Sequence, residues 1–92
     1  MEPDEDELVG ILRDACRMCG ARSATLSVGG APVAAWPPFD ERDGPMIASA
    51  LFETPAGAHA EFSLFAAEAR ELTQIQTLVL KAYAAHAQAC LP

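Results

Sequence analysis

Residues 24–35 read ATLSVGGAPVAA, and this stretch decides the fold. In its first half, apolar residues alternate with small polar ones, which is the period of a strand with one buried face. Gly29-Gly30 follows and suits the positive φ angles of a tight hairpin turn. The second strand is predicted from Val33 to Trp36. Pro32 has no N–H for the ladder, so it indicates the start of a strand or an edge strand.

A helix is predicted before this hairpin. Pro3 and the acids at positions 4–7 favour a helix start, because carboxylates stabilise the positive end of the helix dipole. Apolar residues then recur at steps of three and four up to Cys19, as on one face of a helix. Gly20 is suited to end it. We therefore expect a helix over about residues 4–19.

The segment after the hairpin predicts two more strands. Residues 37–45, PPFDERDGP, contain three prolines and predict an irregular polar connection. Met46 to Glu53 is interpreted as a third strand, with a helix as the alternative for this segment. A turn at 54–57 leads into a fourth strand at 58–65, where apolar and polar residues alternate again.

A long helix is predicted from about residue 68 to 89, because this stretch contains neither Gly nor Pro. Two apolar rows run along it. The row expected to cover the sheet consists of Leu72, Ile75, Val79, Ala82 and His86. The second row consists of Leu80, Tyr83, Ala84, Ala87 and Leu91. A second row predicts a further contact, either with the first helix or with another copy of this one.

The predicted order of elements gives an α+β fold. It consists of a four-stranded antiparallel sheet with the N- and C-terminal helices packed on one face. Ninety-two residues suit a single domain, here 1–92. Such a small chain has a thin core, and its many alanines bury little area each. A partner chain would supplement that core, which favours oligomerisation.

The distribution of charge argues against several classes of partner. The net charge is −7, and five acids lie within the first seven residues. Lys81 is the chain's one lysine, and basic residues form no cluster. We therefore expect neither nucleic acid nor anionic membrane as a ligand, because both require clustered Lys and Arg. No apolar stretch suits a membrane span and the N-terminus is unlike a signal peptide, so a cytoplasmic location is expected.

The cysteines and histidines are the candidate residues for a redox or metal-binding site. Cys16 and Cys19 form a CxxC at the C-terminal end of the first predicted helix. Buried structural thiols are the favoured interpretation, with a metal site and a redox pair as alternatives. A metal site would need ligands from Cys90, His86 or His59. His59 is expected to be solvated, and His86, on the inner row of the last helix, is expected to be packed or hydrogen-bonded. We predict no catalytic residues, no metal and no cofactor.

The chain resembles a GAF domain, the signalling module related to PAS. The resemblance rests on LVGILRDAC at 8–16, on the hairpin at 24–35, on TPAGAHAEFSLF at 54–65 and on ELTQIQTLVLKAYAAHAQ at 71–88. GAF domains are longer, and their extra residues between the hairpins roof a ligand pocket. Here about nine residues join the hairpins, which implies a minimal core with little room for a ligand. A roadblock-like domain is the alternative, and it requires a central helix from 45–53.

These observations favour a non-catalytic signalling or regulatory module that dimerises through its C-terminal helix and binds protein. The predicted interface residues are Leu80, Tyr83, Ala84, Ala87, Trp36 and Phe39. Trp36 and Phe39 flank two prolines, so they form either a plug at the end of the sheet or an exposed anchor for a partner. The alternative function is small-molecule sensing in a reduced pocket under the 37–45 loop.

Overall fold

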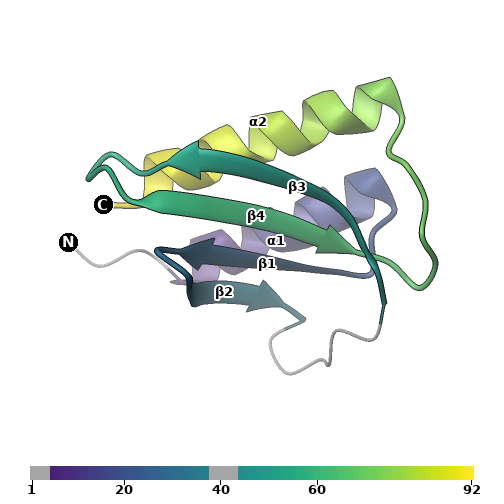
Figure 1. Cartoon of the computed structure of the whole chain (residues 1–92), viewed down its shortest axis with the longest axis horizontal. Coiled ribbons are helices and arrows are strands. Elements are labelled where there is room, and N and C mark those ends of the chain that lie inside the picture. The colour runs from purple at the N-terminus through teal and green to yellow at the C-terminus, as the bar shows by residue number, and fades with distance from the viewer. Residues whose placement is uncertain (1–4, 38–43) are drawn as a thin grey trace.

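The computed structural model describes residues 5–37 and 44–92. Its elements in chain order are α1 (Glu5–Cys19), β1 (Ser23–Val28), β2 (Ala31–Trp36), β3 (Met46–Glu53), β4 (His59–Phe65) and α2 (Gln74–Cys90). The four strands form an antiparallel sheet in the order β2-β1-β4-β3. Both helices lie behind this sheet in Figure 1, and they pack against each other. The predicted α+β fold is confirmed.

The strand register separates a covered face of the sheet from an open one. One row across the covered face consists of Ala34, Leu26, Phe62 and Ala50. The next row, on the open face, consists of Ala35, Thr25, Ser63 and Ser49. Apolar residues of the first row belong to the core together with Leu8, Leu12 and Leu64 from the neighbouring elements. The alternation in residues 24–28 therefore predicted correctly which side chains the helices cover.

The bounds of the strands agree closely with the sequence pattern. β3 occupies Met46–Glu53 as predicted, so this segment does not supply the central helix that a roadblock-like domain requires. β2 begins two residues earlier than predicted, at Ala31. Pro32 is accommodated because β2 is an edge strand, where a missing N–H costs no ladder bond on the outer side.

Gly20 ends α1 as predicted, and the hydrogen bonds show how. Its φ of +66° lies in the left-handed region that glycine adopts without a Cβ penalty. The N–H of Ala21 donates to the carbonyl of Cys16 over 2.8 Å, which is the bond of a Schellman motif. Arg70 also donates to the carbonyl of Cys19. Two carbonyl groups in the last turn of α1 thus accept hydrogen bonds, one from the backbone and one from a side chain distant in sequence.

The predicted start of the last helix, near residue 68, is wrong. α2 begins at Gln74, and residues 67–73 form a connection without regular secondary structure. A capping box fixes this start. The Thr73 hydroxyl accepts from the Gln76 N–H, and the Gln76 side chain accepts from the Thr73 N–H, each over 3.1 Å. Two backbone donors that a helix leaves without partners are satisfied in this way.

Replacing Thr73 by alanine is expected to lower the free energy of unfolding by about 1 kcal/mol, the usual cost of losing an N-cap. Urea denaturation followed by circular dichroism measures the change. Thr77→Ala is the matched control, because Thr77 lies one turn further on and its hydroxyl donates to the Thr73 carbonyl. Equal destabilisation by both variants would contradict the capping role assigned to Thr73.

The predicted division of α2 into two apolar rows is only partly right, because Val79 of the first row packs against the core although the other first-row residues of α2 are exposed. Leu80, Ala84, Ala87 and Leu91 are buried in the core. Ile75, Ala82 and His86, which were expected to cover the sheet, are exposed. Since α2 packs against α1 and β3, its buried row faces the angle between them. Both rows are apolar, so periodicity could not identify the inner one.

Candidate functional site

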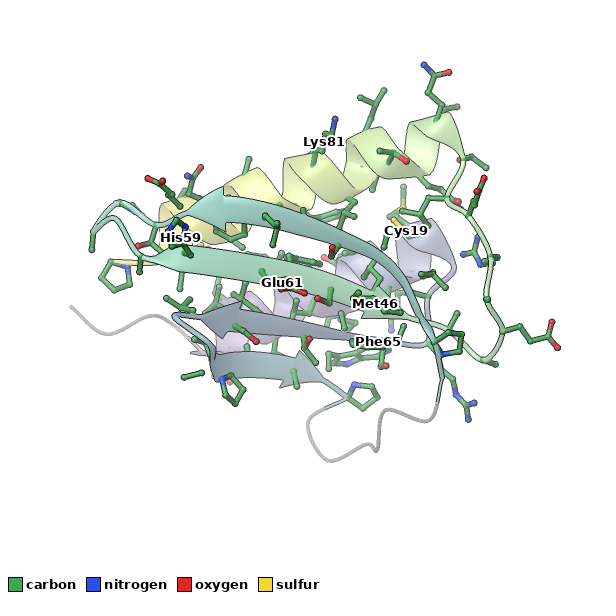
Figure 2. All side chains as sticks on the ribbon, in the orientation of Figure 1. Cys19, Met46, His59, Glu61, Phe65 and Lys81 are labelled. Atoms are coloured by element: carbon green, nitrogen blue, oxygen red, sulfur yellow. The ribbon has the colours of Figure 1, made fainter. Side chains whose placement is uncertain are left out.

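The surface of α2 that faces away from the protein carries an apolar stripe. This outer row consists of Ile75, Leu78, Ala82, Ala85 and Ala89, all exposed. Ile75 is 74% exposed and Leu78 is 61% exposed. The row follows steps of three, four, three and four residues, the spacing of a coiled-coil seam. Figure 2 shows Lys81 pointing outward from α2. The described part of the chain leaves this seam uncovered.

The helix that carries the outer row is also almost without charge. Lys81 is the one Asp, Glu, Lys or Arg residue between Gln74 and Cys90, although the chain as a whole carries a net charge of −7. The acids of the first helix lie on a different element. Because the aliphatic stem of a lysine can lie along apolar surface with its ammonium in water, Lys81 does not block contact with this row.

Most of the predicted interface residues lie elsewhere. Leu80, Ala84 and Ala87 are core residues, so their assignment to an interface is wrong. They pack against the chain's own α1 and sheet because those elements approach α2 from that side. Tyr83 and Trp36 are half-buried and pack against the core, which supports the plug interpretation of Trp36. Phe39 lies outside the described residues.

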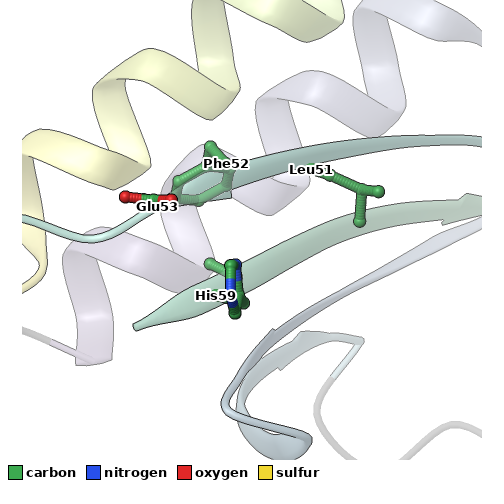
Figure 3. A pocket seen from close by; sticks show the side chains of 5 residues that line it. Leu51, Phe52, Glu53 and His59 are labelled. Carbon is green, nitrogen blue, oxygen red and sulfur yellow. The ribbon is translucent and has the colours of Figure 1, made fainter. Parts of the chain in front are cut away.

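The open face of the sheet contains a depression of about 370 Å³. It is lined by Leu51, Phe52, Glu53, His59 and Ala60, where β3 ends and β4 begins (Figure 3). The 37–45 connection precedes the other end of β3, so this is not the pocket considered under that loop. His59 is exposed here, as predicted, and lies opposite Glu53 in the strand register.

The CxxC thiols lie inside the protein, at the end of α1. Cys16 and Cys19 are both buried in the core. Burial raises the pKa of the Cys19 thiol above its ordinary value, and the nearby Arg70 guanidinium partly offsets the rise. The Cys19 Sγ lies 3.5 Å from the carbonyl oxygen of Gln76. A buried, protonated thiol is a poor nucleophile and a poor metal ligand, so this geometry favours the structural interpretation.

His86 is exposed and does not lie on the inner side of α2, contrary to the prediction. Its Nε2 lies 3.7 Å from Oε1 of Glu7, near the start of α1, and both side chains are about half exposed. Cys90 lies one turn further along α2, beside the same pair. Sequence reasoning missed this cluster because Glu7 comes from the other end of the chain. The His-x-x-x-Cys spacing at 86–90 was the available signal, since residues four apart share one face of a helix.

No family model matches the chain, and no match was found among the curated proteins or the solved structures compared with it. The resemblance to a GAF domain therefore stays a prediction. One finding bears on membranes: within residues 5–37 and 44–92, neither helix is both long enough and apolar enough to cross a bilayer.

Proposed function

We propose that this chain is a non-catalytic regulatory module of the cytoplasm that acts by pairing with a second copy and binding other proteins. The outer row of α2 is the proposed dimer interface. One observation carries the proposal: an apolar row with the spacing of a coiled-coil seam is exposed on a helix that the core already holds from the other side. Exposed apolar surface of this kind is usually an interaction site.

The distribution of side-chain size along the outer row supports a second copy of this chain as the partner that covers the row. The large residues, Ile75 and Leu78, lie in its first half, and alanines occupy the second half. In an antiparallel pair centred near Ala82, Ile75 would face Ala89 of the second copy, and Leu78 would face Ala85. Large side chains would then meet small ones on both sides of the central Ala82 pair. The two-fold symmetry of a homodimer produces this match twice.

The size of the row predicts a weak dimer. Full burial of a leucine or isoleucine contributes about 1.5–3 kcal/mol, and the pair would bury four such side chains. Association costs at least about 4 kcal/mol in lost translational and rotational freedom. The remainder is at most about 2–8 kcal/mol, which corresponds to a Kd between roughly tens of millimolar and about one micromolar. Such a module would respond to changes in its own concentration and would be strengthened by tethering to a larger assembly.

Replacing Leu78 by aspartate is expected to abolish the dimer while leaving the fold intact. The carboxylates would be buried without partners at the contact, which costs several kcal/mol and exceeds the stability of so small an interface. Light scattering over a dilution series from about ten micromolar to about one millimolar, the range in which a dimer of this strength becomes populated, measures the change in mass. Leu51→Asp is the matched control, because Leu51 is also highly exposed, 76% against 61% for Leu78, but lies on the open sheet face. A monomeric wild type, or a Leu78→Asp dimer, would overturn the proposal.

The depression beside His59 favours a second candidate, a small-molecule-sensing GAF-like domain with a reduced pocket. Its volume of about 370 Å³ lies at the lower end of the roughly 300–1,000 Å³ of ligand pockets. His59 and Glu53 supply polar groups at its rim. Native mass spectrometry of the protein purified from cells separates the two candidates, since a retained ligand adds a fixed mass to each chain and a dimer doubles the mass.

A further inference from the structure

Three side chains of different chemistry converge where α1 begins and α2 ends. They are Glu7 of α1 and His86 and Cys90 of α2. One ligand atom from each, a carboxylate oxygen, an imidazole nitrogen and a thiol sulfur, lie within 4.8 Å of one another. Glu7 and His86 are exposed and Cys90 is half-buried, so the cluster is open to solvent.

The fold itself holds these residues together. His86 and Cys90 are four residues apart on one helix, which places them on the same face one turn apart. Glu7 reaches them because α1 packs beside α2. Two of the side chains are thus fixed by helix geometry and the third by the contact between the helices.

We propose that Glu7, His86 and Cys90 bind a divalent transition-metal ion, with Zn²⁺ the best fit. Zinc takes sulfur, nitrogen and oxygen ligands at about 2.0–2.3 Å, so its ligand atoms lie roughly 3.3–3.8 Å apart in a tetrahedron. Exposed side chains can close the remaining distance by rotating about their χ angles. Ca²⁺ and Mg²⁺ are excluded as preferred ions, because hard cations take oxygen ligands and not thiolate.

The cluster supplies three ligands and leaves the fourth position to water or to a group from another molecule. Three protein ligands with an open position are the pattern of zinc sites that interact with exogenous ligands, whereas structural sites use four. The thiol loses its proton to the solvent when the metal binds. Because the ion would link α1 to α2, it would also stabilise the folded state over the unfolded one. This inference is independent of the proposed dimer.

Titration with Co²⁺ tests the site directly. A stoichiometric complex with a thiolate-to-cobalt charge-transfer band in the near ultraviolet is expected, and Zn²⁺ should abolish the band. In His86→Gln, affinity should fall at least roughly tenfold, since losing even an outer-shell partner costs about 10–100-fold. His59→Gln is the matched control and should bind like the wild type, because His59 lies on the open face of the sheet (Figure 2). Circular dichroism checks that both variants are folded.

Alkylation of thiols gives a second measurement that does not depend on a variant. Cys16 and Cys19 are buried, so iodoacetamide should modify Cys90 first in the native protein. Zn²⁺ should slow that modification, because a thiolate that holds the metal is not free to attack iodoacetamide. A Co²⁺ complex without the thiolate band, equal affinity in His86→Gln and wild type, or Cys90 alkylation that Zn²⁺ leaves unchanged would each overturn the proposal.

Discussion

The Leu80→Asp variant is expected to be unfolded in water, whereas Leu78→Asp, two residues away on the same helix, should fold like the wild type. Leu80 is 3% exposed and belongs to the core, so a carboxylate there would be buried without a partner. That burial costs several kcal/mol. A small domain has a total stability near the lower end of the usual 5–15 kcal/mol, which leaves little in reserve.

Far-ultraviolet circular dichroism and urea titration of the two variants measure this difference. The comparison holds the helix, the new residue and the added charge constant, so only the direction in which the side chain points differs. A cooperative transition for Leu80→Asp at the wild-type midpoint would show that α2 does not present Leu80 to the core. The test also separates a loss of folding from a loss of dimerisation. With a charge at Leu80 alone, the two losses could not be told apart.

Much of the sheet could be predicted from local pattern, because alternating apolar and polar residues indicate which side chains of a strand are buried. Apolar and polar residues alternate in β1, and Gly29-Gly30 fixes the turn that follows it. β3 was predicted with the correct bounds even though a helix was the alternative. In the β1–β2 hairpin the residue types, the turn chemistry and the period of two all agree, and that agreement makes a prediction dependable.

The face and the start of α2 could not be predicted from periodicity in the same way. Its residues are apolar on most sides, so the choice between the row of Leu80 and the row of Ile75 depends on where α1 and β3 lie. The start was readable in principle, because Thr73 and Gln76 have the spacing of a capping box. The absence of Gly and Pro upstream suggested a longer helix, although it does not by itself stabilise one.

The candidate sites depend on tertiary contacts to different degrees. The outer row of α2 is contained in one helix, yet the sequence does not show that it stays uncovered. The metal cluster needs α1 and α2 to pack together, and no local pattern connects Glu7 to His86. The proposed dimer contact and metal site therefore depend on which helix faces stay exposed once the core has formed, and the same question arises for the two faces of the sheet.

Phe62→Ala is expected to lower the free energy of unfolding by about 3–5 kcal/mol, the usual cost of removing a buried phenylalanine ring. Phe62 is fully buried on β4, a central strand, where it lies between Leu26 and Ala50 on the covered face. The ring fills the space between the sheet and the helices. Small neighbours such as alanine cannot close the cavity that the substitution would leave, so most of the lost contact stays lost.

Leu51→Ala is the matched control for this prediction. Leu51 is on the adjacent strand β3, but it points to the open face and is 76% exposed. Its truncation should change the free energy of unfolding by no more than about 0.5 kcal/mol, as for most surface substitutions. Urea denaturation of dilute protein, where dimers are dissociated, measures both variants. Comparable losses would mean that the open face is covered by the protein's own chain, whereas the expected difference leaves that face available to a partner.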